Sequence, residues 1–185
     1  MRDPAALSPV LLLRHPAVAV VAGTCYGRSD VALAEEPQAL AASLRAQLPA
    51  DLLIVSSPSS RCLRLARELG SVEIDARLRE IDFGEWEMHH YDHIERERID
   101  AWAADPLHFR PPGGETVAEM AARAIDALRH WQAKAAGRTL LVVSHGGPLR
   151  AIAGQLLGLL PEQWLTLHFA CGEPYRHAGS QLERL

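Results

Sequence analysis

Three short runs of nearly continuous Val, Ile and Leu constrain the fold of this chain more than any other feature. They occupy residues 10–13, 52–55 and 140–143. Strands buried on both faces have this pattern, as in a parallel sheet that is covered by helices. Stretches with helical periodicity lie between the runs. The sequence therefore predicts an α/β fold, a three-layer α/β/α sandwich with a mostly parallel central sheet.

Four helices are expected around this sheet. Thr116 followed by Glu119 forms a capping-box motif, and an apolar stripe with helical spacing runs from there to a stop near Gly137. Pro148 suits the first turn of a further helix, which Gly158 would end. The segment 165–170 alternates weakly and predicts a late edge strand. The expected helices span residues 36–48, 59–69, 116–136 and 148–157.

Residues 80–114 break this alternation with a polar, aromatic and Pro-rich composition. A stretch of this length between core elements is usually a lid or a binding insertion rather than a linker. The sequence has no internal repeat and no low-complexity tract. We therefore expect a single domain over residues 1–185, with a lid insertion at about 80–114.

Charge and cysteine content exclude several classes of protein. Acidic residues number 23 against 19 basic ones, a net charge of -4. Proteins that coat nucleic acid or anionic membranes normally have the opposite balance, so neither partner is expected. Cys25, Cys62 and Cys171 form no C-x-x-C pair, which argues against a disulfide framework or a thiolate zinc site. No segment has the length of a membrane span or of a signal-peptide core, and we expect a cytoplasmic protein.

Polar side chains follow each of the three predicted buried strands. The first strand is followed by Arg14 and His15, the second leads to Arg61, and the third leads to His145. In open α/β sheets, ligands gather beyond the carboxyl ends of the strands. Two histidines and two arginines at one edge suit a phosphate group, because guanidinium groups pair well with phosphate oxygens.

Five motifs occur in order along the chain, at residues 14–15, 57–61, 77–87, 112–116 and 144–147. This ordered set resembles the histidine phosphatase superfamily, which has the phosphoglycerate-mutase-like fold. Residues 25–33 also resemble the C-Y-G-R-x-D-x-x-L signature of the α-ribazole phosphatases within it. The resemblance implies a phosphomonoesterase that works through a phosphohistidine, needs no metal or other cofactor, and acts on a small phosphorylated molecule. For the α-ribazole branch, that molecule is α-ribazole 5′-phosphate, a precursor of the lower loop of cobalamin.

The resemblance also implies roles for individual residues. His15 would be the nucleophile, because a neutral imidazole can attack phosphorus. Arg14 and Arg61 would neutralise the phosphoryl oxygens, and His145 would donate to the same oxygens. The residues implied to bind the substrate or its phosphate are Arg14, Arg28, Arg61, His145, Gly146 and Tyr26.

A carboxyl group must protonate the leaving alkoxide and later accept a proton from water. Glu80 aligns with the acid of the family. Spacing alone does not choose it over the neighbouring carboxylates, which are Asp82, Glu85, Glu87 and Glu115. Tyr26 and Trp86 are candidates for stacking on a flat base in the substrate.

Two departures from the family pattern keep other functions open. Pro16 follows the nucleophile where glycine is commonest, and Met88 replaces a glycine that commonly follows Trp-Glu. Because of Pro16, a non-catalytic phosphate-binding regulator is one alternative. A cofactor-dependent phosphoglycerate mutase is another, and the lack of an extra Lys/Arg-rich lid within residues 80–114 argues against it. His89 and His93 are spaced as metal ligands on a helix would be, but no further ligand set accompanies them, so no metal is expected. Assembly as a homodimer stays open.

Overall fold

A six-stranded sheet forms the centre of the protein in a computed structural model that describes residues 8–185. The strand order is β3-β2-β4-β1-β5-β6. The first four strands in this order are parallel, while β5 pairs antiparallel with both β1 and β6. This arrangement confirms the predicted α/β fold with its mostly parallel sheet. The strands are β1 Val10–Arg14, β2 Leu52–Ser56, β3 Val72–Ile74, β4 Thr139–Ser144, β5 Pro174–Ala178 and β6 Gln181–Arg184.

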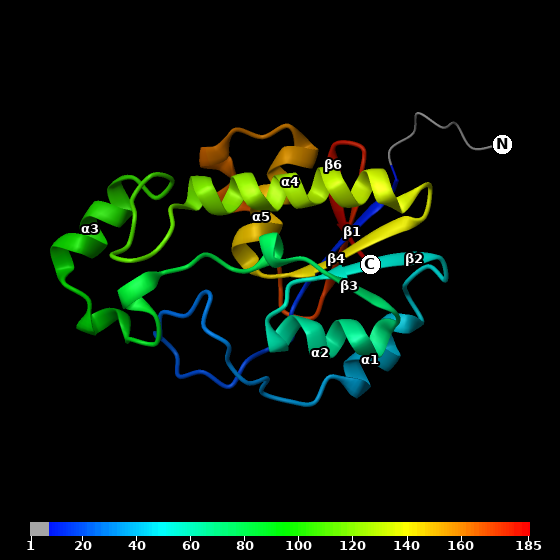
Figure 1. The fold of residues 1–185 in the computed structure, drawn as a ribbon, viewed down its shortest axis with the longest axis horizontal. Helices are drawn as coiled ribbons and strands as arrows, with labels where there is room; N and C mark the ends of the chain where they lie inside the picture. The colour runs from blue at the N-terminus through cyan, green and yellow to red at the C-terminus, as the bar shows by residue number, and fades with distance from the viewer. Residues whose placement is uncertain (1–7) are drawn as a thin grey trace.

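Helices cover both faces of the sheet, with α1 and α2 on one side and α4 and α5 on the other (Figure 1). Side chains of β1 alternate between the two faces. Leu11 and Leu13 pack into the core under α1 and α2, whereas Val10 and Leu12 join the core under α4 and α5. The three-layer prediction is therefore correct. The helices are α1 Gln38–Arg45, α2 Ser60–Leu69, α3 Arg96–Ala104, α4 Val117–Ala135 and α5 Gly146–Leu157.

The capping residues in the sequence closely predict where α4 and α5 begin and end. The Glu119 N–H donates to Thr116 Oγ1 at 3.1 Å, and the Thr116 N–H donates to the Glu119 carboxylate at 2.9 Å, which completes the capping box. Ala136 and Gly137 both have positive φ angles, and they end α4. Pro148 lies in the first turn of α5, and Gly158 ends that helix in the left-handed conformation.

The sequence prediction is wrong at the carboxyl-terminal edge of the sheet. Residues 165–170 are not a strand, because the chain forms a 3₁₀ helix over Pro161–Thr166 and then an irregular segment. The last two strands, β5 and the edge strand β6, come later and are largely polar, so they have no apolar alternation to reveal them. The three-residue β3 is also absent from the prediction, and α1 is shorter than the helix expected at 36–48.

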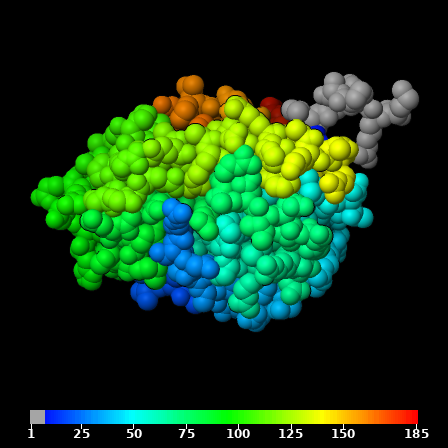
Figure 2. All heavy atoms as spheres, viewed as in Figure 1, coloured from blue at the N-terminus to red at the C-terminus, as the bar shows by residue number. Residues whose placement is uncertain are grey.

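Residues 80–114, the segment expected to be an insertion and called the insertion below, reach one end of the molecule and carry α3 (Figure 1). An aromatic cluster supports it: Trp86 is 4% exposed, stacks on Phe109 at 5.5 Å between ring centroids, and meets Trp102 edge-on at 6.2 Å. The Cys25 N–H donates to the His89 carbonyl at 2.8 Å. In Figure 2 the loop after β1, in blue, lies on the surface between the insertion and the segment that follows β2.

Two of the sequence expectations concern the whole chain, of which the structure describes residues 8–185. Residues 1–7 of the expected domain lie outside them. Within residues 8–185, no helix is both long enough and apolar enough to cross a membrane.

Candidate active site

The carboxyl ends of β1, β2 and β4 bring together the residues that the sequence analysis singled out. The His15 N–H donates to the Ser144 carbonyl at 3.0 Å, which extends the β1–β4 pairing by one residue. The rings of His15 and His145 meet edge-on with centroids 5.3 Å apart. Arg61 lies in the first turn of α2, and its Nε is 3.2 Å from Nδ1 of His145. The parallel register of the three strands is therefore what builds this cluster.

His15 is held in one tautomer. Its Nδ1 lies 2.7 Å from the Pro16 carbonyl oxygen, which can only accept a hydrogen bond. Nδ1 must therefore carry the proton, and Nε2 keeps a free lone pair. Burial is the main reason that the pKa of His15 falls to about 4; the bond to Pro16 opposes this, and the positive charges of Arg61 and Arg14 add to it. At neutral pH the ring is thus uncharged, and its Nε2 lone pair is available.

Proline at position 16 does not remove the contact that orients His15. Proline lacks the backbone N–H but keeps its carbonyl, and the carbonyl is the group used here. The departure from the family pattern therefore leaves the orienting contact of His15 in place.

Arg61 is fully buried, and protein acceptors hold part of its guanidinium group. Nη1 donates to the Ser29 carbonyl at 2.7 Å and Nη2 donates to the Gly27 carbonyl at 2.6 Å. With the Nε bond to His145, three of the five N–H groups of arginine are used. The remaining two belong to Nη1 and Nη2, and Nη1 also lies 3.9 Å from the Asp30 carboxylate.

Arg14 has a buried donor that no described residue satisfies. Its Nη1 donates to the Phe169 carbonyl at 2.9 Å, but within residues 8–185 its Nε has no hydrogen-bond partner. Leaving such a donor unpaired costs about 1–3 kcal/mol. An anionic oxygen from a ligand would supply the missing acceptor.

His145 is buried, with both ring nitrogens engaged by the protein. Its Nδ1 accepts from Arg61 Nε, so its Nε2 carries the proton and donates to Ser57 Oγ at 2.8 Å. Burial, with the charge of Arg61, holds the pKa of His145 well below its ordinary value. For His145 to donate to a phosphate oxygen, the ligand would have to replace Ser57. In the sequence analysis Ser57 is the first residue of the 57–61 motif and has no role assigned to it.

Glu80 lies beside the first turn of α5. Its carboxylate accepts from the Gly147 N–H at 3.1 Å and from the Ile81 N–H at 3.0 Å. This helix start also brings Gly146 to the site: a Cβ added at Gly146 would lie 3.7 Å from Cζ of Arg14. Glu80 and the start of α5 therefore border the arginine and histidine cluster.

The alternative carboxylates have other partners or positions. Asp82 pairs with Arg28 at 2.9 Å, Glu115 pairs with Arg123, and Glu85 is exposed. Glu87 accepts four backbone N–H groups at 2.8–3.1 Å, from Gly27, Arg28, Ser29 and Phe83. Burial opposes ionisation of Glu87, yet these bonds keep its pKa below the ordinary value. Its part is to fasten the loop after β1 to the insertion, a role that the sequence pattern did not reveal.

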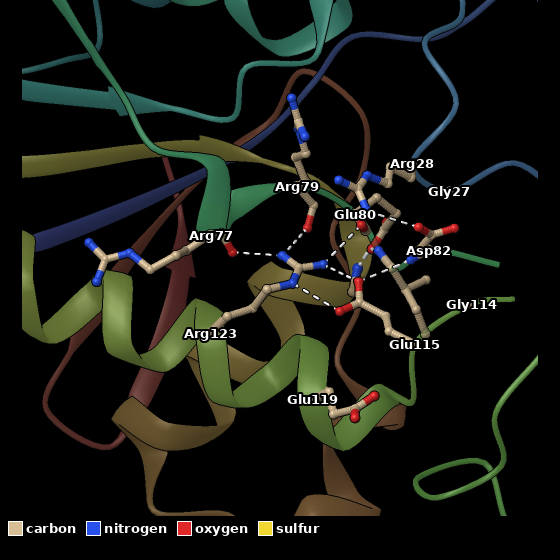
Figure 3. Close-up of polar contacts among 12 residues, drawn as sticks. Gly27, Arg28, Arg77, Arg79, Glu80, Asp82, Gly114, Glu115, Glu119 and Arg123 are labelled. Carbon is tan, nitrogen blue, oxygen red and sulfur yellow. Dashed lines mark hydrogen bonds and ion pairs between the residues drawn. The ribbon is translucent and has the colours of Figure 1, made fainter. Parts of the chain in front are cut away.

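Arg123 of α4 organises the backbone that carries Glu80 (Figure 3). Its guanidinium donates to the carbonyls of Arg77 at 2.7 Å, Arg79 at 2.6 Å and Glu80 at 3.0 Å, and it makes two bonds to the Glu115 carboxylate. These contacts use all five N–H groups of the side chain. We call Arg123 and Glu115 the Arg123 clamp.

The expected substrate contacts differ in how open they are. Arg28 is 54% exposed and pairs with Asp82, so its guanidinium can reach a bound molecule. The Arg61 guanidinium lies 5.6 Å from the centroid of the Tyr26 ring, so one face of Tyr26 is occupied. Trp86 is buried against Phe109, so the idea that it stacks on a substrate base is wrong.

The histidines of the insertion do not share a helix. A short 3₁₀ helix covers only Tyr91–His93, and His89 precedes it. Among the described residues, no group of three or more His, Cys, Asp or Glu side chains is placed to hold a metal ion. Met88, next to these histidines, is exposed and has φ 65°, a conformation that favours glycine.

Comparison with known proteins agrees with this geometry. Residues 10–175 match the histidine phosphatase superfamily (branch 1). The chain belongs to this family. A glucosyl-3-phosphoglycerate phosphatase of Mycolicibacterium vanbaalenii is 32% identical over 180 residues, covering 85% of this chain and 78% of the relative. The protein is thus a histidine phosphatase superfamily phosphatase, as the motifs predicted.

Solved structures of the family superpose closely. Mycobacterial glucosyl-3-phosphoglycerate phosphatase has a TM-score of 0.80 and 26% identity, with 97% of each chain covered. The α-ribazole phosphatase of Shigella flexneri has a TM-score of 0.82 and 24% identity, covering 91% of this chain and 89% of that one. The two substrates named for these relatives differ, so the family match supports a phosphatase and leaves the substrate of this chain unresolved.

Proposed function

We propose that this histidine phosphatase hydrolyses a small phosphate monoester through a phosphohistidine on His15, without a metal. The observation that carries the proposal is the state of His15: a neutral ring, held by Pro16 with Nε2 free, beside two arginines. The unpartnered Nε of Arg14 and the spare N–H groups of Arg61 are suited to hold phosphoryl oxygens.

Two steps complete the reaction. In the first, the Nε2 lone pair of His15 attacks phosphorus, the N–P bond forms, the ester P–O bond breaks, and Glu80 gives its proton to the leaving alkoxide. In the second, Glu80 removes a proton from water as the water oxygen attacks phosphorus. The N–P bond then breaks, His15 returns to its neutral form, and inorganic phosphate leaves. Arg14 and Arg61 balance the charge that develops on the phosphoryl oxygens.

For the substrate we propose α-ribazole 5′-phosphate. The support is the Cys25-Tyr26-Gly27-Arg28-x-Asp30 pattern, which resembles the signature of that branch. Glucosyl-3-phosphoglycerate is the second candidate, because the relative at 32% identity carries that name.

The first test is hydrolysis of p-nitrophenyl phosphate in EDTA by wild type and by His15→Ala. We expect the wild type to release inorganic phosphate and the variant to lose activity by at least a thousandfold, about the size of losing an essential catalytic group. Equal rates would refute the mechanism. An inactive wild type would favour the regulator alternative. Transfer between glycerate carbons that requires 2,3-bisphosphoglycerate, without accumulation of phosphate, would favour the mutase.

The second test compares kcat/KM for α-ribazole 5′-phosphate and glucosyl-3-phosphoglycerate, since this ratio measures discrimination between substrates. We expect α-ribazole 5′-phosphate to be preferred. A preference for the glucosyl compound would replace the first candidate with the second and leave the chemistry unchanged.

A further inference from the structure

A cavity of about 340 Å³ lies beside Glu80. It is built by the insertion, by the starts of α4 and α5, and by the 3₁₀ helix over Pro161–Thr166. Most of its lining is apolar. Its apolar lining includes Phe83, Trp102, Leu107, Val117, Met120 and Trp164.

The cavity adjoins the phosphoryl site. Glu80 and Gly147 line it, and the hydrogen bond between them joins the proposed acid to α5. A Cβ at the neighbouring Gly146 would lie 3.7 Å from Arg14 Cζ and 3.4 Å from Arg150 Nη1. A phosphate held by Arg14 would therefore have its ester oxygen near Glu80 and its leaving group at the mouth of this cavity.

The walls offer rings and few polar groups. Phe83 and Trp102 meet edge-on with centroids 6.2 Å apart. The Trp164 indole N–H already donates to the Leu159 carbonyl, and Arg150 Nε donates to the Leu167 carbonyl. The charged residues of the lining, within residues 8–185, are Glu80 and Arg150. A leaving group with many hydroxyls would lose hydrogen bonds to water here, whereas an apolar ring would gain by leaving water.

We propose that this cavity binds the leaving group, and that the substrates of this protein carry a flat, apolar ring on the alcohol that leaves. This inference rests on the proposed function and narrows its substrate class. The benzimidazole of α-ribazole 5′-phosphate has this character. The hydroxyl groups and the carboxylate of glucosyl-3-phosphoglycerate do not.

The test uses primary-alcohol phosphates of similar leaving-group acidity: ethyl, 2-phenylethyl and 2-(1-naphthyl)ethyl phosphate, with glycerol 1-phosphate as the polar member. For the wild type we expect kcat/KM to rise about tenfold or more from the ethyl to the naphthylethyl ester, because more apolar surface is buried. Glycerol 1-phosphate should be no better than ethyl phosphate.

Two variants locate the effect. Trp102→Ala removes a wall, and Val117→Phe narrows the cavity without touching α3. Each should cut the naphthylethyl to ethyl ratio of kcat/KM about fivefold or more, and the ratio is compared because a general loss of activity lowers both rates alike. Tyr91→Ala removes an aromatic side chain of the insertion that does not line the cavity, and its ratio should equal that of the wild type.

The outcomes separate this inference from the proposed function. If no ester, p-nitrophenyl phosphate included, is hydrolysed, the proposed function fails. If the esters are hydrolysed but the wild-type ratio is near one, if glycerol 1-phosphate or glucosyl-3-phosphoglycerate is preferred, or if both cavity variants keep the wild-type ratio, the leaving-group assignment is overturned.

Discussion

The chemistry of His15 depends on residues beside it in the sequence and on residues far from it. Pro16 fixes the tautomer through its carbonyl, while burial and the charges of Arg61 and Arg14 keep the ring from taking up a second proton. The adjacency of Arg14 and His15 is visible in the sequence. Arg61 follows a different strand, so its position beside His145 could be predicted only by assuming that the strands are parallel.

The lowered pKa of His15 predicts how folding stability depends on pH. The unfolded imidazole titrates near 6.5, but the folded one accepts a proton only near pH 4. The folded state thus binds fewer protons between these values. The neutral His15 therefore costs no free energy of unfolding above about pH 6.5. The free energy of unfolding falls as the pH drops from about 6.5 to about 4, and below about pH 4 the contribution of His15 stays constant.

Urea unfolding at about pH 7 and about pH 4.5 checks this. Between these two pH values the free energy of unfolding should fall by about 2 kcal/mol less in His15→Asn than in the wild type. This figure follows from the lowered pKa of His15 at about 1.4 kcal/mol per pKa unit. His145 acts in the same direction and remains in both proteins. The same loss in both would show that His15 is not held neutral.

At the scale of elements, the start of α5 and the middle of α4 together place Glu80. The first turn of α5 donates the Gly147 N–H to its carboxylate, and the Arg123 clamp holds the backbone on both sides of Arg79. The spacing of the acidic residues did not select Glu80 from its neighbours. In the structure Asp82, Glu87 and Glu115 each make another contact, which supports the proposal that Glu80 is the acid.

We predict that Arg123→Lys misplaces Glu80. Lysine keeps the charge but lacks the planar fork that reaches three carbonyls and Glu115 at once. The kcat for ethyl phosphate should fall about tenfold or more, which is part of the rate that general acid catalysis contributes. The kcat for p-nitrophenyl phosphate should fall less, because its leaving group needs little protonation.

Arg129→Lys is the matched control, since Arg129 is an exposed arginine on the same helix. It should behave as the wild type with both esters. Equal losses for the two esters in Arg123→Lys would indicate general damage to the fold instead of loss of positioning.

At the scale of the whole molecule, the elements that the sequence predicts best are the strands buried on both faces. The three apolar runs became β1, β2 and β4, and their polar ends became the site. The polar hairpin of β5 and β6 and the short β3 were not predictable, because their strands are only partly buried. The Arg123 clamp and the four bonds to Glu87 were not predictable either, since both join residues that only the folded chain brings together.

The insertion should also differ from the sheet in local stability. No residue of α3 is fully buried, whereas β4 is buried over five of its six positions. We expect amides of α3 to exchange with solvent at least about a hundredfold faster than those of β4, because opening this helix exposes little apolar surface. Hydrogen exchange followed by mass spectrometry measures this. Equal protection of the two elements would contradict a separately opening insertion.

The most direct test of the central claim is a rapid acid-free quench of the wild type with ³²P-labelled p-nitrophenyl phosphate, followed by peptide mapping. We predict a transient phosphoenzyme that is stable in alkali and labile in acid, with the label on the peptide of His15 and absent in His15→Ala. Turnover with no labelled protein at any time, or a label on another residue, would contradict the account.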